Sequence, residues 1–430
     1  MNYVIIGGSA AGVMACEAIR KRDEKAKITL VSDEKLPLYS RCLLTYLLAG
    51  QITEDKLTFR DPDFYKKNKI DAILGVRAKS IDVKKRAVKL SNGKSILYDK
   101  LLLATGANPK SIDIPGVDKE GFFTIRRIDD ARGMIKLMDK VKRVVVLGGG
   151  LIGLRDAYAL MHQGKKVSVI AKSSQVLSQM LDKEAADIIR DTLVANGIEV
   201  KTQAAAKEIT GGKTVEGVLL DDGTKVDCQM VIVGKGVIAD IALAKGSGIK
   251  THWGFLVDEY MATNVKGIFA AGDCAETRDL ASGEMTINGL WPCAVEQGGI
   301  AGANMTGEKI AYEGSLSMNS VEFFGLPAIS MGITKPKTDD YETLVFENRN
   351  KNLYRKIVLK DNLICGAVFI NGVESAGVIN VLMRKRIDIS GIKERLVDNN
   401  FSFATVMPLI KDNSDSFTAE EFLDTIKTYQ

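Results

Sequence analysis

The sequence has few of the residues that build metal centres and disulfide frameworks. Its 430 residues include two histidines, His162 and His252, and six cysteines. The cysteines lie far apart, with no CxxC pair and no spacing typical of metal ligands. We therefore expect no structural zinc, no iron–sulfur ligation, no other bound metal and no disulfide framework.

Long apolar runs and a strong charge of one sign are missing as well. No stretch approaches the roughly 18 apolar residues of a membrane-spanning helix, and the first strand pattern begins at residue 3, which argues against a signal peptide. The 59 basic and 54 acidic residues are interspersed and leave a net charge of +5, which is small for a nucleic-acid-binding protein. We expect a cytoplasmic protein that binds neither nucleic acid nor membrane.

The first twelve residues, MNYVIIGGSAAG, join an apolar strand to a glycine-rich turn and a helical pattern. In the GxGxxG arrangement Gly7 makes the tight turn, Ser9 takes the second glycine position, and Gly12 allows close packing of the helix on the strand. The N–H groups at the helix start can then hold a pyrophosphate. A second strand ends at Asp33 and Glu34, where an acid would bind the hydroxyls of an adenosine ribose.

Residues 142–171 repeat this architecture with Gly148, Gly150 and Gly153 in strict GxGxxG register. Two such fingerprints imply two dinucleotide sites, the arrangement of an enzyme that passes a hydride between two cofactors. At the end of the second strand Ala171 stands where NAD-binding proteins carry an acid, and Lys172 follows. A missing acid beside a cation favours the 2′-phosphate of NADPH, although Lys172 can also be an ordinary surface lysine.

A short apolar helix is predicted within residues 35–50, KLPLYSRCLLTYLLAG, and it starts close to Cys42. The positive potential at a helix start stabilises a thiolate, so Cys42 can be a reactive thiol. Alternatively it is a small buried hydrophobic residue, which is common for unpaired cysteine.

Three further turns carry informative residues. Asn92-Gly93 is a hairpin signal between two alternating strands. The strand KLLLATG leaves the small residues 104–106 where backbone must approach a neighbour closely. The strand GIFAAGD delivers Asp273 to a turn, and a helix with Pro292 at its first position follows, with its N–H groups free for a ligand.

The ordered motifs GGSAAG, LLLATGANP, GGGLIG and GIFAAGDCAE resemble the pyridine nucleotide-disulfide oxidoreductase superfamily of FAD enzymes over roughly residues 1–310. The resemblance implies that Gly7, Gly12 and Glu34 hold the adenosine and pyrophosphate of FAD. It also implies that residues 104–106 line the flavin site, and that Asp273 binds the ribityl and phosphate end. NAD(P)H would bind the second fingerprint, in a domain inserted into the FAD domain.

Within this superfamily two branches remain open. The stretch YSRCLLTYLLAG is similar to rubredoxin reductase-like and nitrite reductase-like members, which pass electrons to iron–sulfur carriers. Cys42, Tyr46 and Gly50 also match the single-cysteine pattern of coenzyme A disulfide reductases and NADH oxidases, although Leu43 replaces the usual glycine. A third reading, a flavin-bearing structural subunit, follows from Arg155, which stands where relatives place a glutamate beside the nicotinamide.

The tail from residue 316 resembles the interface domain of the superfamily more loosely, which implies a homodimer. Its stretch MNSVEFFGLP, together with GLWPCAVEQG, is similar to FAD subunits of phenylglyoxylate dehydrogenase-type and tungsten aldehyde oxidoreductase-type complexes, which adds a partner subunit. The tail also carries two basic clusters, 355–356 and 384–386, that can steer an acidic electron carrier.

We therefore predict an α/β protein with two Rossmann-like domains and a C-terminal α+β domain. The expected boundaries are 1–112 and 245–315 for the FAD domain, 113–244 for the NAD(P) domain and 316–430 for the interface domain. The predicted function is an FAD-dependent NAD(P)H:acceptor oxidoreductase. Its expected site residues are Gly7, Ser9, Ala10, Ala11, Gly12, Asp33, Glu34, Arg41, Cys42, Ala104, Thr105, Gly106, Gly148, Gly150, Leu151, Ile152, Gly153, Lys172, Gly272, Asp273, Pro292 and Ala294.

Overall fold

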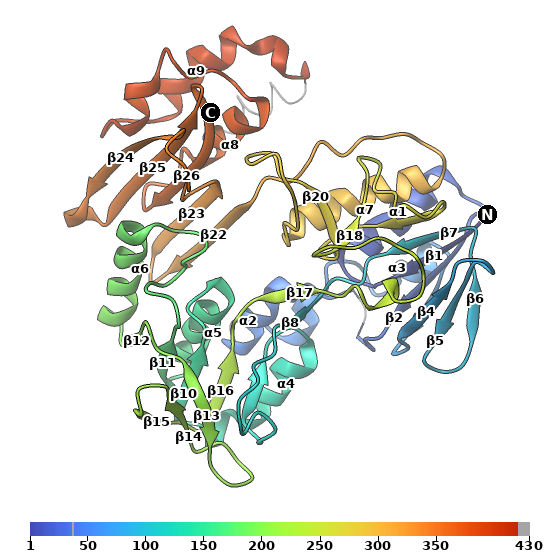
Figure 1. Cartoon of the computed structure of the whole chain (residues 1–430), viewed down its shortest axis with the longest axis horizontal. Helices are drawn as coiled ribbons and strands as arrows, with labels where there is room; N and C mark the ends of the chain where they lie inside the picture. Colours follow the sequence, from blue (N-terminus) through green and yellow to red (C-terminus); the bar gives the residue numbers. More distant parts are fainter. Residues whose placement is uncertain (37, 420–430) are drawn as a thin grey trace.

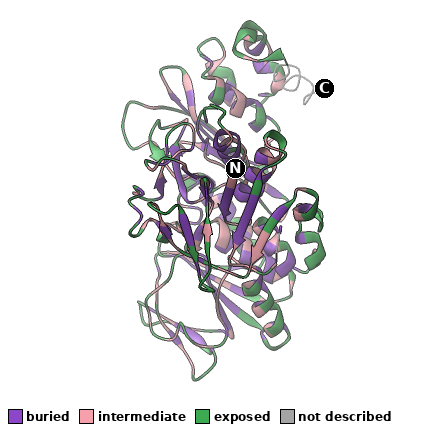
Figure 2. Cartoon of the chain, turned by 90° about the vertical axis from the view of Figure 1, so that its right-hand side faces the viewer, coloured by how far each residue is buried: buried purple, intermediate pink, exposed green. Residues whose placement is uncertain are grey.

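The computed structural model describes residues 1–36 and 38–419 and shows two parallel sheets followed by an antiparallel one (Figure 1). We call the corresponding parts of the molecule the N-terminal, central and C-terminal units. The predicted α/β class with two Rossmann-like sheets is confirmed. The buried residues are concentrated in the strands of these sheets (Figure 2).

The N-terminal unit is built on a five-stranded sheet of order β19-β7-β1-β2-β3, in which all neighbours are parallel. Its strands are β1 (Asn2–Ile6), β2 (Lys27–Ser32), β3 (Ile70–Leu74), β7 (Lys100–Leu103) and β19 (Ile268–Ala270). Helices α1 (Ala10–Arg22) and α7 (Trp291–Met305) pack against each other beside this sheet (Figure 1). A Cβ atom on Gly298 would lie 2.2 Å from the carbonyl oxygen of Ala11, so this close packing requires glycine.

The central unit repeats the design with the order β12-β11-β10-β16-β9, again all parallel. Its strands are β9 (Phe122–Thr124), β10 (Arg143–Leu147), β11 (Lys166–Ile170), β12 (Glu199–Lys201) and β16 (Met230–Val233). The helices are α4 (Ile128–Leu137), α5 (Leu151–His162) and α6 (Lys183–Ala195). The strand, turn and helix predicted for residues 142–171 are therefore confirmed as β10, α5 and β11.

Each of these units also carries a three-stranded antiparallel sheet. The first consists of β4 (Ala78–Asp82), β5 (Ala87–Leu90) and β6 (Ser95–Leu97), and the second of β13 (Ala206–Thr210), β14 (Gly217–Leu220) and β15 (Lys225–Asp227). The predicted hairpin at Asn92-Gly93 joins β5 to β6, with Gly93 at a φ of +83°. An antiparallel ribbon of β8 (Ala107–Pro109) and β17 (Val237–Ala239) connects the N-terminal and central units.

The C-terminal unit is an antiparallel sheet of order β22-β23-β26-β25-β24 with helices α8 (Ala376–Lys385) and α9 (Phe403–Asp412). Its strands are β22 (Met318–Phe323), β23 (Leu326–Gly332), β24 (Glu342–Asn348), β25 (Leu353–Lys360) and β26 (Leu363–Ile370). Short strands β18 (Phe255–Leu256), β20 (Ala275–Arg278) and β21 (Met285–Thr286) precede it. Among the described residues, no helix combines the length and the apolar character needed to span a membrane.

A buried carboxylate joins the central unit to the C-terminal unit. Asp182 is the N-cap of α6 and accepts a hydrogen bond from the backbone N–H of Ala185. The same carboxylate accepts hydrogen bonds of 2.7 Å from the Tyr354 hydroxyl and from the Lys356 ammonium, both on β25. The contact therefore combines a helix cap with an ion pair between two units.

The prediction that 355–356 form a surface basic cluster is wrong. Arg355 and Lys356 are both buried, because successive side chains of β25 point to opposite faces of its sheet and both faces are covered. Lys356 reaches Asp182, whereas Arg355 lies 4.6 Å from the ring centre of Phe401 and donates to the carbonyl of Leu396. In the second basic cluster, Arg384 and Arg386 are exposed.

Candidate functional site

A long cavity opens where the carboxyl ends of β1, β2, β7 and β19 meet. It encloses about 1220 Å³ of empty space, part of which is open to solvent. Nine separate stretches of the sequence contribute to its wall, so the fold brings together most of the residues predicted for the flavin site. These are Gly7, Ser9, Ala10, Ala11, Asp33, Glu34, Arg41, Cys42, Ala104, Thr105, Gly106, Gly272, Asp273 and Ala294.

The first glycine turn has the geometry of a phosphate cradle. Gly7 has a φ of +121°, and a Cβ atom there would lie 2.0 Å from the carbonyl oxygen of Ala104. Gly12 does not line the cavity; a Cβ atom on it would lie 1.9 Å from the carbonyl oxygen of Gly7, so it serves the packing of α1. The Ser9 side chain does not cap α1, and no acid lies in its first turn. Its first N–H groups are therefore available to a pyrophosphate.

The two acids after β2 are both paired with arginines. Asp33 lies 2.9 Å from the Arg127 guanidinium. Glu34 accepts hydrogen bonds from Arg41 and from the Tyr39 hydroxyl. Burial raises the pKa of Tyr39 above its ordinary value, so this hydroxyl stays a hydrogen-bond donor. The acids thus face the cavity with their positions fixed by neighbouring side chains.

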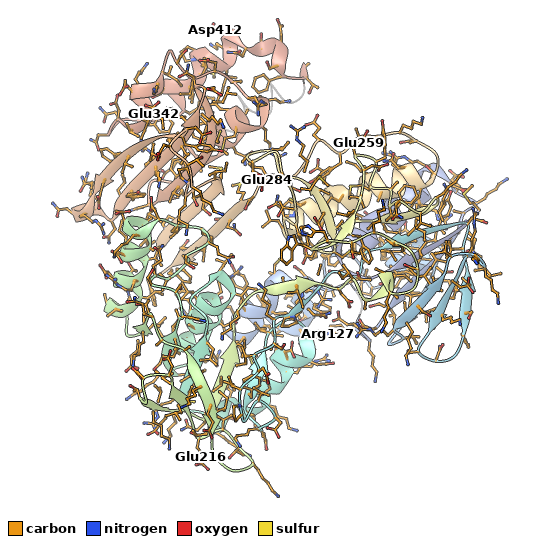
Figure 3. All side chains as sticks on the ribbon, viewed as in Figure 1. Arg127, Glu216, Glu259, Glu284, Glu342 and Asp412 are labelled. Atoms are coloured by element: carbon orange, nitrogen blue, oxygen red, sulfur yellow. The ribbon has the colours of Figure 1, made fainter. Side chains whose placement is uncertain are left out.

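Arg126 and Arg127 are cavity residues that the sequence analysis missed. Both come from the segment between β9 and α4 of the central unit, and Figure 3 places Arg127 where that unit meets the N-terminal unit. Arg126 donates to Asp273 at 2.9 Å and to the carbonyl oxygen of Ala107 at 3.0 Å. No local motif marks these arginines, because only the packing of the two units brings them to the cavity. Each is paired with a carboxylate of the wall, so together they fix the positions of Asp273 and Asp33.

The start of α7 forms another part of the wall. The helix begins at Trp291, so Pro292 is its second residue and not its first. Trp291 and Ala294 line the cavity, and Pro292 does not. The Trp291 ring packs edge-on against Phe59, with ring centres 5.0 Å apart. No acid lies in the first turn, so the partial positive charge of this helix end is directed at the cavity.

Cys42 lies in a short 3₁₀ turn, Arg41–Leu43, directly before α2 (Leu44–Leu48). Its side chain is exposed and lines the cavity. The reading of Cys42 as a small buried hydrophobic residue is therefore wrong. An exposed thiol on the cavity wall agrees with the reactive interpretation.

Arg155 extends from α5 toward the same region. Its guanidinium lies 5.3 Å from the ring centre of Tyr46, which is one helical turn after Cys42. The glutamate expected at this position in relatives is thus replaced by a cation stacked on an aromatic ring.

The second glycine turn forms a separate site on the central unit. Gly148 has a φ of +136°, and a Cβ atom on it would lie 2.4 Å from the carbonyl oxygen of Gly234. Gly153 packs equally closely, since its Cβ atom would lie 2.2 Å from the carbonyl oxygen of Gly148. At Gly150, in contrast, the nearest atom to a Cβ would be 4.0 Å away, which leaves room for a ligand.

The remaining predicted residues of this second site surround that opening. Leu151 and Ile152 begin α5, which has no acid in its first turn. Lys172 is exposed just after β11, whereas Ala171 is buried. An uncapped helix start beside a glycine turn and a lysine fits the pyrophosphate and adenosine of a nicotinamide nucleotide.

Comparisons with known proteins agree with this geometry. The family model described as pyridine nucleotide-disulphide oxidoreductase matches residues 1–298, and the model of the rubredoxin NAD+ reductase C-terminal domain matches residues 318–387. The chain is 32% identical to the epsilon subunit of NADH-dependent phenylglyoxylate dehydrogenase from Aromatoleum evansii, over 93% of the chain and 95% of that subunit. It is 30% identical to nitrite reductase [NAD(P)H] from Bacillus subtilis over 97% of the chain, but covers only 50% of that protein.

Among solved structures, an NAD-dependent persulfide reductase from A. fulgidus superposes with a TM-score of 0.86. The sequence identity is 27%, and the match covers 96% of this chain and 84% of the reductase. The similarity therefore extends through all three units.

Proposed function

Because the chain belongs to the pyridine nucleotide-disulphide oxidoreductase family, we propose that it oxidises NAD(P)H and passes the electrons to an iron–sulfur carrier or a partner subunit. It is an NAD(P)H-dependent flavoprotein oxidoreductase with FAD and NAD(P)H as its cofactors. We assign FAD to the cavity of the N-terminal unit and NAD(P)H to the glycine turn after β10. The domain boundaries and site residues predicted from the sequence are part of this proposal.

The match of residues 318–387 to the rubredoxin NAD+ reductase C-terminal domain carries the choice of acceptor. This match covers β22 to β26 and all of α8, which make up the C-terminal unit apart from α9 and the segments around it. The phenylglyoxylate dehydrogenase relative is a subunit of a larger enzyme, which supports a partner protein as the acceptor. We also propose that the protein forms a homodimer.

FAD, when bound, supplies the step between a two-electron hydride donor and one-electron acceptors. The chain's own residues bind and orient the reactants. The N–H groups at the start of α1 would bind the diphosphate, and Arg126 and Arg127 hold Asp273 and Asp33 in place. The start of α7 favours negative charge at the opposite end of the cavity. Arg155 belongs to the helix that starts at the second glycine turn, and it contacts Tyr46, which follows Cys42 of the first site by four residues. This pair can orient the nicotinamide end.

The exposed Cys42 supports a second candidate, a single-cysteine enzyme that reduces coenzyme A disulfide, a persulfide or oxygen. The persulfide reductase similarity points in the same direction. A flavin-bearing structural subunit is a third candidate, and the replacement of glutamate by Arg155 favours it. The variant Cys42→Ser, assayed with iron–sulfur carriers and with disulfide, persulfide or oxygen as acceptors, separates these functions.

We expect Cys42→Ser to leave the reduction of an iron–sulfur carrier by NAD(P)H unchanged, because electron transfer from flavin to such a carrier needs no thiol. Steady-state rates with rubredoxin and ferredoxin as acceptors provide the measurement. The matched control is Cys365→Ser, a change at a cysteine of the C-terminal sheet outside the cavity.

The same variants decide the alternatives. A single-cysteine enzyme would lose disulfide, persulfide or oxygen reduction in Cys42→Ser, and its wild type would show a long-wavelength thiolate–flavin band after anaerobic reduction. A structural subunit would bind FAD but would not be reduced by NADH or NADPH. Loss of carrier reduction in Cys42→Ser alone would contradict the proposed function.

We expect Lys172→Ala to weaken NADPH binding by about 1.5–3 kcal/mol, the free energy of a hydrogen bond to a charged group, and to leave NADH binding nearly unchanged. Stopped-flow titration of flavin reduction with each nucleotide gives both affinities. Lys207→Ala, at an exposed lysine of β13, is the control. Equal losses for NADH and NADPH would show that Lys172 does not read the 2′ position.

Introducing an acid at Ala171 is a poorer test of the same question, because the Ala171 side chain is buried. It also packs closely against the backbone of Gly149: a Cβ atom on Gly149 would lie only 2.9 Å from the Cβ of Ala171.

A further inference from the structure

A second lysine lies beside the glycine turn of the central unit. Lys235 lies two residues after the end of β16, and the intervening Gly234 touches this turn on two sides. The carbonyl oxygen of Gly234 would be 2.4 Å from a Cβ atom on Gly148, and a Cβ atom on Gly234 itself would be 2.6 Å from the Cα of Gly153. Lys235 is therefore one residue away from the backbone that would cradle a pyrophosphate.

The strand order places Lys235 and Lys172 on opposite sides of this turn. In the sheet β10 lies between β11 and β16, and all three strands run parallel, so their carboxyl ends meet at one edge. The glycine turn follows β10, Lys172 follows β11, and Lys235 follows β16. A dinucleotide lying across this edge meets one lysine on each side of its pyrophosphate.

Neither ammonium group has a hydrogen bond or an ion pair within the described part of the chain, although carboxylates are frequent in the central unit. Lys235 is exposed at this edge of the sheet. Partial desolvation lowers the pKa of its ammonium group, and repulsion from the positive charge of Lys172 lowers this pKa further. The two positive charges therefore lie close enough to repel each other beside an uncapped helix start. An anionic ligand between them would relieve this repulsion.

We propose that Lys235 binds the pyrophosphate of the nicotinamide nucleotide, whereas Lys172 binds only its 2′-phosphate. This inference rests on the proposed function. Lys235 sits on the β16 side of the turn, next to the opening at Gly150, where the diphosphate of either nucleotide would lie. Lys172 sits on the β11 side, where the adenosine ribose is read. Lys235 thus increases the affinity for both NADH and NADPH, whereas Lys172 determines which of the two binds more tightly.

The test compares Lys235→Met, which keeps the apolar stem of the side chain, with Lys235→Arg, Lys172→Met and the control Lys207→Met in the FAD-loaded protein. Calorimetric titration uses two probes: ADP-ribose, which has the pyrophosphate but no 2′-phosphate, and adenosine 2′-monophosphate, which has the reverse. We expect Lys235→Met to weaken ADP-ribose at least tenfold and to leave adenosine 2′-monophosphate unchanged. Lys172→Met should show the opposite pattern, and Lys235→Arg should retain most of the ADP-ribose affinity.

Flavin reduction provides an independent reading. Lys235→Met should raise the half-saturating concentrations of NADH and NADPH by the same factor, so that their ratio stays at the wild-type value. Unchanged ADP-ribose affinity in Lys235→Met, or an equal loss for adenosine 2′-monophosphate, would overturn the assignment. If wild-type flavin is reduced by neither nucleotide, the proposed function fails, whatever the variants bind.

Discussion

Asp182→Ala is expected to lower the free energy of unfolding by about 3–5 kcal/mol, because it leaves the Lys356 ammonium buried without its counter-charge. The change also removes a hydrogen-bond acceptor from the buried Tyr354 hydroxyl and the N-cap of α6. Loss of such a cap alone costs about 1 kcal/mol. Urea unfolding followed by circular dichroism measures the difference, and limited proteolysis shows whether the C-terminal unit separates first.

Two controls isolate the buried pair. Asp187→Ala removes a carboxylate from the same helix, but its partners Lys183 and Arg190 reach solvent, so we expect a loss below about 1 kcal/mol. Adding Lys356→Met to Asp182→Ala should restore part of the stability, since the double variant buries no unpaired charge. A loss in Asp182→Ala no larger than in Asp187→Ala would show that this carboxylate does not hold the two units together.

Asp156→Asn is expected to stabilise the protein increasingly as the pH rises. Asp156 is fully buried in α5, and neither of its carboxyl oxygens has a hydrogen-bond partner among the described residues. Burial raises the pKa of this carboxyl well above its ordinary value, an effect that Arg155 opposes only in part. The folded state therefore holds a proton that the unfolded state releases.

The direction of the pH effect follows from that difference. Below about pH 4 both states carry the proton, and Asp156 costs no ionisation energy. Above this pH the unfolded state ionises and the folded state does not, so stability falls by about 1.4 kcal/mol per pH unit until the raised folded pKa is reached. Asparagine has the same shape but cannot ionise, so the advantage of the variant should grow with this slope.

Urea unfolding of wild type and Asp156→Asn from pH 4.5 to 8.5 measures the slope. Asp139→Asn, at an exposed residue before β10, is the control and should follow the wild-type curve. Parallel curves for wild type and Asp156→Asn would mean that the carboxyl ionises equally in both states, which contradicts a buried and neutral acid.

Features with a local steric cause could be predicted from the sequence. Gly7 and Gly148 adopt left-handed backbone where a side chain would strike a neighbouring carbonyl, and only glycine satisfies that condition. The residues around these turns, and Asp273 at the end of β19, therefore stand where the motifs place them. The exposed position of Cys42 needed the structure, since its sequence context suits a buried thiol equally well.

Features that depend on packing between units could not be predicted. Arg126 lies beside Asp273 only because the central unit folds back onto the N-terminal one. Arg355 and Lys356 look like a surface cluster in the sequence, but both side chains are buried because both faces of the sheet are covered at β25. In each case the partner is remote in the chain, and periodicity of charge or hydrophobicity carries no information about it.

The interrupted sheet of the N-terminal unit also determines the order in which a nascent chain can fold. Its edge strand β19 and the helix α7 that packs on α1 are made only after the whole central sheet, whose strands lie within residues 122–233. The central unit can therefore complete its core on the ribosome while the flavin cavity still lacks Gly272, Asp273 and Trp291. The cavity for FAD is complete only after residue 305, the end of α7, has left the exit tunnel. If FAD is scarce during synthesis, we therefore expect a chain in which the central unit is folded and the flavin cavity is empty.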